Sequence, residues 1–293
     1  MRRWLDAFGR RGDVVGMNRR NVELVYALNE RRHYPLADDK ILAKELLSAA
    51  GVAVPRTLLT CDGLYDLPRA MRLIEGLQDF VVKPSRGGGG NGISVVTKRL
   101  GPGLWRGAGG RVIDADELHY QMAQILFGAF ARGALNDRVL VEPRIVAHEA
   151  YQGLWADGLC DVRIITVHAK PLLAMVRVPT AQSDGKANLH QGGLGLAVEL
   201  DTGLVVRAVC RGESLTHHPD SGGPLLGLRL PHWEQTVDVA RRAASAVPLQ
   251  YLGVDIVVDE REGPLVLEIN ARPGLEIQNV HGVGLNPLLE ALS

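Results

Sequence analysis

One twelve-residue stretch constrains this chain more than any other. Residues 81–92 read VVKPSRGGGGNG, in which an apolar strand delivers Lys83 and the backbone then loses nearly all its side chains. Glycines allow positive φ and let backbone N–H groups approach an anion closely. A nest of such amides beside a lysine can hold phosphate oxygens. The stretch therefore predicts a phosphate-binding turn.

The residues after the turn define its setting. The run ISVVTK (93–98) is apolar and β-branched, so it predicts a second strand. No lysine and Ser/Thr pair follows the glycines, which argues against a G-x-x-x-x-G-K-[ST] loop, and the strand argues against a G-x-G-x-x-G turn that opens a helix. A flexible linker or a tight hairpin is the structural alternative to a phosphate site.

The last predicted hairpin carries a second polar group. Its strands GVDIVVD (253–259) and PLVLEIN (264–270) flank the turn EREG. Residues i and i+2 of a strand share a face, so Glu268 and Asn270 project together, and antiparallel pairing can bring Asp255 to that face. Two carboxylates and an amide oxygen suit Mg²⁺ held together with substrate phosphates. A solvent-facing polar row is the alternative.

The order of predicted elements mixes helices with hairpins, which favours an α+β fold over a doubly wound parallel sheet. Two segments are expected at the surface, namely the glycine-rich loop 101–112 with Trp105 and the polar loop that contains His217 and His218. Helices are expected at 17–32, 40–51, 64–76, 114–131 and 231–247, strands at 56–60, 79–84, 93–98 and 138–146, and hairpins at 161–178, 196–209 and 253–270.

Composition narrows the function classes. Lysine plus arginine number 33, as do aspartate plus glutamate, and a net charge of zero argues against a dedicated nucleic-acid binder. Cys61, Cys160 and Cys210 fit neither a disulfide framework nor a C-x-x-C metal site. No apolar run is long enough to span a bilayer, and the N-terminus lacks the apolar stretch of a signal peptide. We therefore expect a cytoplasmic protein.

Arginine pairs crowd the N-terminal 35 residues. Eight arginines stand there against four acidic residues. A solvated helix face is one interpretation, and a docking surface for an anionic acceptor or partner is the other. The pairs are Arg2/Arg3, Arg10/Arg11, Arg19/Arg20 and Arg31/Arg32.

Taken in this order, the lysine strand, the glycine turn and the carboxylate hairpin resemble the ATP-grasp superfamily, and within it the RimK-related alpha-L-glutamate ligases. The similarity runs from about Asp38 to Gln278. It implies an α+β fold of two lobes with ATP between them. The resemblance also implies four segments, namely an N-terminal helical segment 1–37, a helix 38–52 that joins the larger lobe, a small lobe 53–140 and a large lobe 141–293.

The resemblance assigns roles toward ATP. Lys40 in DDKILAK and Lys83 would bind phosphates, and the loop 85–92 would cover them. In VEPRIVAHE, Glu142 would receive the adenine amino group and Glu149 the ribose hydroxyls. The full implied set is Lys40, Lys83, Ser85, Gly88, Gly89, Gly90, Asn91, Gly92, Glu142, Arg144, Ile145, Glu149 and Asp161.

The resemblance also assigns the reacting centre. Asp255, Glu268 and Asn270 would hold Mg²⁺ or Mn²⁺. The segments DVR and NLHQGG would face the catalytic cleft, and one of several arginines would hold phosphoryl oxygens. The candidates are Arg163, Arg177, Arg272, Asn188 and His190.

Two departures from the glutamate ligases concern the acceptor. Lys40 comes early, so we expect the N-terminal α/β domain that usually precedes the first lysine in this family to be reduced to little more than a helix. Gln191 stands where the ligases carry arginine, and Arg272 stands where they carry a small residue. A shifted arginine could take over the contact with the acyl phosphate.

The implied activity is ATP- and magnesium-dependent ligation of a carboxylate to an amine through an acyl phosphate, with glutamate or a similar amino acid as a candidate substrate. Substrates would be small molecules or peptides, with neither nucleic acid nor a membrane span involved, and a homo-oligomer stays open. The alternatives are an ATP-grasp small-molecule kinase and a non-catalytic nucleotide-binding module. The complete carboxylate set argues against the module.

Overall fold

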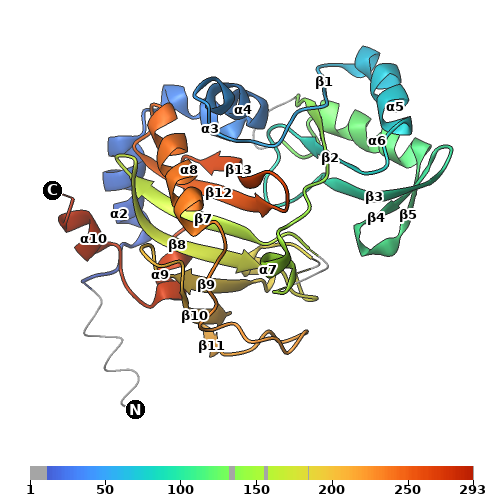
Figure 1. Ribbon diagram of the computed structural model, residues 1–293. Coiled ribbons are helices and arrows are strands. Elements are labelled where there is room, and N and C mark those ends of the chain that lie inside the picture. The colour runs from blue at the N-terminus through green and yellow to red at the C-terminus, as the bar shows by residue number, and fades with distance from the viewer. Residues whose placement is uncertain (1–11, 132–135, 155–157, 184, 293) are drawn as a thin grey trace. The chain divides into compact units, whose positions relative to one another are not determined.

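The computed structural model describes residues 12–131, 136–154, 158–183 and 185–292 (Figure 1). These residues form two compact units, each built around one antiparallel sheet. We call residues 39–45 and 54–146 the lysine unit, and residues 12–38, 46–53 and 147–292 the carboxylate unit. The predicted α+β class is confirmed. The boundary expected after residue 140 would divide strand β6 (Val139–Glu142), which lies wholly in the lysine unit.

The lysine unit contains a six-stranded sheet in the order β1-β6-β2-β3-β4-β5. Both strands that flank the glycine turn form as predicted, and they pair antiparallel with each other. The strand expected at 56–60 begins later, at Leu59, although the Leu58 backbone N–H already donates to the Val141 carbonyl of β6 at 2.9 Å. The strands are β1 (Leu59–Cys61), β2 (Phe80–Pro84), β3 (Ser94–Gly101), β4 (Leu104–Gly107), β5 (Val112–Asp114) and β6.

Helices α5 (Leu67–Glu75) and α6 (Ala115–Leu126) pack against this sheet and each other. The Asp114 side chain accepts a hydrogen bond from the Glu117 backbone N–H at 2.8 Å, which satisfies one of the unpaired donors at the start of α6. Leu118, Met122 and Ile125 recur at helical spacing and are fully buried. A third helix, α4 (Lys40–Ala49), begins in the lysine unit and ends in the carboxylate unit.

The expected surface loop at 101–112 is wrong. Residues 104–107 form β4, and Trp105 is completely buried in the core of the lysine unit. Its ring meets Phe80 edge-on, with 6.0 Å between the ring centroids. Side chains of a strand alternate between faces, so exposed Leu104 and Arg106 flank a buried tryptophan. The surrounding glycines form the turns at both ends of this short strand rather than one long loop.

The carboxylate unit contains a seven-stranded sheet in the order β11-β10-β9-β8-β7-β12-β13 (Figure 1). All three predicted hairpins form, and every neighbouring pair is antiparallel. The strands are β7 (Asp161–Val167), β8 (Lys170–Val178), β9 (Leu194–Val198), β10 (Val205–Cys210), β11 (Glu213–Leu215), β12 (Tyr251–Asp259) and β13 (Gly263–Asn270).

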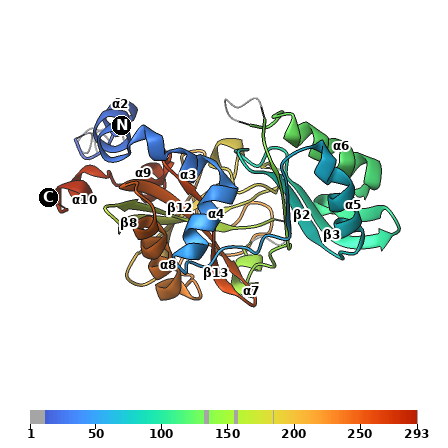
Figure 2. The ribbon, with the colours of Figure 1, turned by 90° about the horizontal axis from the view of Figure 1, so that it is seen from above.

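Two helices cover opposite faces of this sheet (Figure 2). The predicted helix at 231–247 is α8 (Trp233–Ala246), which packs along β7, β8, β12 and β13. On the other face, α9 (Glu276–His281) packs on β8, β9 and β10. Gly195 of β9 allows this approach, because a Cβ there would lie 2.4 Å from a methyl group of Val280. The shorter helices are α3 (Pro35–Asp38), α7 (Glu149–Gln152) and α10 (Asn286–Glu290).

The predicted helix 17–32 is shorter than expected. It comprises α2 (Met17–Arg19), a π-helical stretch Arg20–Tyr26 and two further residues, and it ends before Asn29. The Asn29 amide donates to the carbonyls of Tyr251 and Ala271 at 2.7 and 2.8 Å and accepts from two backbone N–H groups. These four bonds tie the chain to the sheet, and the helix therefore stops there.

The N-terminal arginines differ in burial and in their partners. Arg19 forms an exposed ion pair with Glu23 at 2.6 Å, as a solvated helix face would. Arg20 is buried and donates to the Pro273 carbonyl at 3.3 Å. Arg2, Arg3, Arg10 and Arg11 lie outside the described residues.

The surface position expected for His218 is also wrong. His218 is buried, and its Nε2 lies 3.1 Å from the Pro179 carbonyl. Its Nδ1 accepts hydrogen bonds from the backbone N–H groups of Asp220 and Ser221. The buried ring therefore holds the backbone of this polar loop in place. His217 is exposed as expected.

None of the helices in the described ranges is both long and apolar enough to cross a membrane.

Candidate functional site

A row of charged side chains crosses one face of the carboxylate unit. Residues directly opposite each other in adjacent strands share a face. Arg177 on β8 pairs with Asp161 on β7, Arg163 on β7 pairs with Asp255 on β12, and Asp255 pairs with Glu268 on β13. Asp161 and Arg163 are two residues apart on one strand, so the row is continuous. The predicted meeting of Asp255 and Glu268 on one face is confirmed.

Hydrogen bonds join this row. Arg163 donates to both oxygens of Asp255 at 2.7 and 2.6 Å. Arg177 donates to Asp255 at 2.9 Å and bridges to both oxygens of Asp161. Only 1% of the Asp255 side chain is exposed, against about 15% for each arginine. A carboxylate this buried requires such partners, because desolvating an unpaired charge is very unfavourable.

The pKa values of Asp161 and Asp255 are shifted in opposite directions. Burial acts to raise the pKa of Asp255, but the charges and hydrogen bonds of Arg163 and Arg177 outweigh it and hold this pKa well below its usual range. Burial raises the pKa of Asp161 to about 6, although Arg177 opposes the shift, because the negative charge of Asp255 adds to the effect of burial. Asp255 therefore keeps its negative charge to a lower pH than Asp161 does.

The predicted metal ligands meet around Asp255. Asn270 donates from Nδ2 to Asp255 at 3.2 Å and lies 3.5 Å from a Glu268 oxygen. In the described ranges no group of three or more His, Cys, Asp and Glu side chains could hold a metal ion, so a bound ion would rely on two carboxylates, the amide and phosphate oxygens. That donor set fits Mg²⁺. The Asp255 carboxylate already accepts hydrogen bonds from Arg163, Arg177 and Asn270, so a metal ion bound to it would replace one of these donors.

The other predicted residues of this unit lie outside the row. Asn188 accepts from the backbone N–H of His190 at 3.0 Å and so caps the short 3₁₀ turn Leu189–Gln191. Arg272 donates to both oxygens of Asp38 at 2.6 and 2.7 Å and stacks on Tyr34, 4.8 Å from the ring centre. Arg163 and Arg177 are therefore the arginines that join the carboxylates.

The lysine unit buries a second charged cluster. Lys83 lies 2.5 Å from Glu142, and Lys44 of α4 forms an ion pair with the other oxygen of the same carboxylate. Each of the three side chains is less than a tenth exposed. Burial lowers the pKa of Lys44, with Glu142 opposing the shift. Glu142, expected at the adenine, thus serves here as counter-ion to two lysines.

The base of the glycine turn is fixed by Asp39. Buried Asp39 accepts from Arg86 at 3.1 Å, from Arg138 at 2.9 and 3.0 Å, and from the Ser85 hydroxyl. Lys40 donates from Nζ to the Gly87 carbonyl at 2.7 Å. These contacts hold the start of α4 against the first residues of the turn.

The turn itself has the predicted backbone. Gly89, Gly90 and Gly92 all have positive φ, and a Cβ at Gly89 would meet no atom within 4 Å. Gly88 and Asn91 close a turn through a 3.4 Å backbone bond. An open, glycine-lined turn of this kind leaves its amides accessible to an anion.

The predicted adenine segment is divided between the units. Arg144, half-buried in the lysine unit, lies 3.6 Å from Asp79, and Ile145 follows it. Glu149 belongs to the carboxylate unit, where it is exposed in the first turn of α7.

Sequence reasoning missed Lys44 and Asp39. A signal for Lys44 was present, because Lys40 and Lys44 are four residues apart and so share one helix face. Asp39 also caps the start of α4, because its side chain accepts from the backbone N–H of Ile41 at 3.0 Å. Its contacts with Arg86 and Arg138 are long-range and leave no local pattern.

The chain is similar to known proteins in sequence and in fold. The ribosomal protein bS6–L-glutamate ligase of Escherichia coli O7:K1 is 27% identical over 270 residues, which cover 89% of this chain and 64% of that protein. The chain thus spans less than two thirds of this relative. D-alanine–D-alanine ligase from Bacillus anthracis superposes with a TM-score of 0.50 at 16% identity, covering 89% of this chain and 67% of that one.

Biotin carboxylase from Campylobacter jejuni superposes with a TM-score of 0.51 at 16% identity, covering 84% of this chain and 43% of that chain. Both likenesses concern the fold alone. A family model described as sugar-transfer associated ATP-grasp matches residues 19–293, nearly the whole chain. The chain belongs to the sugar-transfer associated ATP-grasp family.

Proposed function

We propose that this protein uses ATP and Mg²⁺ to join a carboxylate to an amine. The observation that carries the proposal is the row in which Asp255, Glu268 and Asn270 meet two arginines on one face of a sheet. Two carboxylates can hold a metal ion, and two guanidinium groups beside them can hold phosphoryl oxygens. The relative described as an L-glutamate ligase supports this reaction class.

The lysine unit would bind the nucleotide. Lys83 and Lys40 supply point charges for phosphates, and the open glycine turn supplies backbone N–H groups. Arg144, Ile145 and Glu149 remain our candidates for adenine and ribose. Phosphate bound at Lys83 would compete with Glu142 for this lysine, and Lys44 would then keep Glu142 paired.

The chemistry would proceed in two steps. A substrate carboxylate attacks the γ-phosphorus of ATP, which forms an acyl phosphate and releases ADP. An amine then attacks the acyl carbon, the carbon–oxygen bond to phosphate breaks, and the amide and inorganic phosphate leave. The bound metal ion, Mg²⁺ or Mn²⁺, would neutralise phosphoryl charge during transfer. Arg163 and Arg177 would orient Asp255 and contact the transferred group, so the protein acts mainly through position and charge.

An ADP-release screen over carboxylate and amine pairs tests this proposal. L-Glutamate enters the screen on both sides because of the glutamate ligase relative, and sugar amines enter because of the family's association with sugar transfer. We expect ADP release to require a carboxylate, to rise with an amine and to stop when EDTA removes the metal. ADP release that no amine accelerates would instead indicate a kinase, and stoichiometric ATP binding without turnover would indicate a binding module.

Lys83→Met should separate phosphate binding from adenosine binding. The variant keeps much of the aliphatic stem but loses the charge, so ATP affinity should fall while adenosine affinity changes little. Loss of one charge-assisted contact corresponds to about 1.5–3 kcal/mol. Calorimetric titrations with ATP and with adenosine measure the difference in affinity. Lys98→Met, which changes an exposed lysine of β3, is the matched control. Equal losses for the two ligands would assign Lys83 a structural role only.

A further inference from the structure

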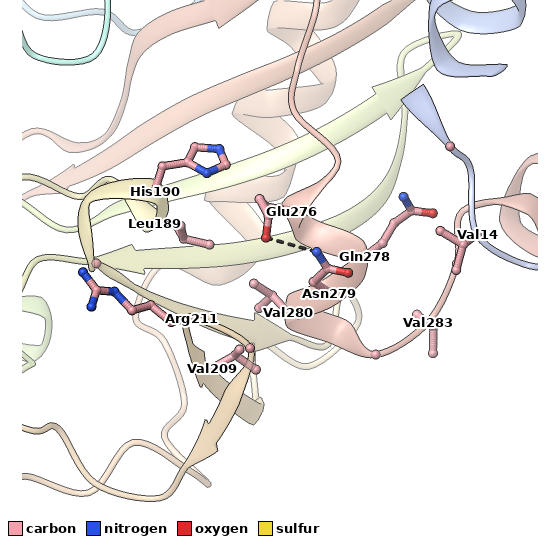
Figure 3. Close-up of a pocket in the computed structure, with 15 residues that line it drawn as sticks. Val14, Leu189, His190, Val209, Arg211, Glu276, Gln278, Asn279, Val280 and Val283 are labelled. Carbon is pink, nitrogen blue, oxygen red and sulfur yellow. Dashed lines mark hydrogen bonds between the residues drawn. The ribbon is translucent and has the colours of Figure 1, made fainter. Parts of the chain in front are cut away.

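The carboxylate unit contains a cavity of about 900 Å³ (Figure 3). Its walls come from the segment around His190, the turn between β10 and β11, helix α9 with the residues that follow it, and the chain near Val14. This volume falls within the range of small-molecule sites and exceeds the needs of a few water molecules.

The lining is mostly uncharged. Valines and glycines make up most of it, and the glycines leave backbone N–H and C=O groups without covering side chains. The ionisable or amide side chains of the lining are His190, Arg211, Glu276, Gln278 and Asn279 (Figure 3). Such a mixture suits a polar body that forms hydrogen bonds rather than a strongly charged one.

Glu276 differs from the carboxylates of the charged row. Asn279 donates to its Oε2 at 3.1 Å, and no lysine, arginine or histidine in the described part of the chain forms an ion pair with it. Glu276 is half-buried at the cavity wall. A partly desolvated carboxylate without a cation gains from a positively charged ligand.

Arg211, the arginine of the cavity lining, hydrogen-bonds to Gln182 and forms no ion pair with Glu276. Arg211 occupies a two-residue turn with φ of 50°, followed by Gly212 at 85°, a backbone region that residues other than glycine seldom adopt. With the Gln182 amide oriented so that its oxygen faces the guanidinium, Arg211 donates to it at 2.8 and 3.0 Å. Arg211 is thus held by a neutral partner, and Glu276 keeps its negative charge uncompensated.

Two chain segments lead from the charged row into this cavity. Gly193 lines the cavity, and two residues later Gly195 lies directly opposite Arg177. Five residues lie between Asn270 at the end of β13 and Glu276. A ligand in the cavity would therefore be held by the same segments that shape the row.

From these observations we propose that the cavity binds the amine substrate, with its ammonium group paired to Glu276 and a neutral, hydroxyl-rich body against Asn279, His190 and the exposed backbone. The assignment of this ligand as acceptor rests on the proposed ligase function. Glu276 is a specificity-determining residue for the amine. A purely structural alternative exists, because an acidic residue in the first turn of a helix stabilises that helix.

Binding of two matched sugars without ATP tests the proposal. D-Glucosamine carries an ammonium group on a hydroxyl-rich body, and N-acetyl-D-glucosamine carries the same body without the charge. Calorimetry on the full chain should show at least a tenfold preference of the wild type for glucosamine, which Glu276→Gln should abolish. Glu234→Gln on α8, across the sheet, should keep the preference. If Glu276 is only structural, Glu276→Gln will shift the melting temperature but keep the preference for glucosamine, and this result would overturn the proposal. A wild type that binds neither sugar would also overturn it.

A second variant tests the same cavity if Glu276→Gln fails to fold. Gly16 lines the cavity with ordinary backbone angles, and a Cβ there would meet no atom within 4 Å, so Gly16→Leu should fold and occupy part of the cavity. We expect it to lose glucosamine binding and to keep ATP binding; unchanged glucosamine binding would contradict the proposal. A wild type that binds glucosamine through Glu276 but never releases ADP would refute the ligase function alone, while active ligation with an unaltered KM for the amine in Glu276→Gln would refute the cavity assignment alone.

Discussion

Glu268→Gln is expected to lower turnover roughly a hundredfold to a thousandfold, a range seen when one preorganised electrostatic contact to the transition state is removed. Glu268 lies directly opposite Asp255 and beside Asn270, and these three side chains would hold the metal ion that offsets phosphoryl charge. Glutamine has nearly the same shape, so packing around β13 is retained. The free energy of unfolding should therefore change little, and nucleotide binding through the lysine unit should remain measurable.

The measurement pairs steady-state ADP release with urea unfolding for each variant. Glu262→Gln is the matched control, since it lies in the turn of the same hairpin and is exposed. It should match the wild type in both assays. A folded Glu268→Gln that turns over normally would remove the metal assignment, and an unfolded one would show that this carboxylate is structural.

Glu142→Gln should cause a large loss of stability. Glu142 neutralises Lys44 and Lys83, and all three side chains are buried. Removing one partner of a buried ion pair leaves an uncompensated charge and typically costs about 3–5 kcal/mol. Urea unfolding at neutral pH measures the loss. Glu117→Gln, which breaks an exposed pair with Arg111, should change the free energy of unfolding by less than about 1 kcal/mol.

The loss in Glu142→Gln should depend on pH. Burial already lowers the pKa of Lys44 below its usual 10.5 while Glu142 opposes that shift, so removing Glu142 lowers the pKa further. The unfolded state then binds more protons than the folded state between the two pKa values, and stability rises with pH across that interval. The variant should recover part of its stability as the pH approaches 10. A wild-type urea midpoint at neutral pH would contradict the assignment of Glu142 as counter-ion.

The parts of the fold that the sequence predicts well are those with local signals. The hairpins follow from alternating apolar runs and from turn residues. The register beside the short EREG turn, in which Asp259 pairs with Gly263, would place Asp255 opposite Leu267. A bulge between Asp255 and Ile256 skips Leu267 and brings Glu268 opposite Asp255, and the sequence carries no local signal for this irregularity.

Other features depend on contacts that a linear pattern does not contain. Arg163 and Arg177 join the site because β7 pairs with β12, about ninety positions further along the chain. Trp105 is buried because β4 adds to the sheet beside β3, although glycines around it suggest a loop. The burial of Lys44 depends on the position of Glu142 on β6.

Transfer of ¹⁸O from the substrate carboxylate tests the central claim most directly. A carboxylate identified in the ADP-release screen is labelled with ¹⁸O on both oxygens and turned over with ATP, Mg²⁺ and the amine, and the products are weighed by mass spectrometry. Ligation through an acyl phosphate leaves the bridging oxygen on the departing phosphate, so the account predicts one ¹⁸O atom in each phosphate and one in each amide. Label in AMP, or unlabelled phosphate formed together with amide, would contradict it.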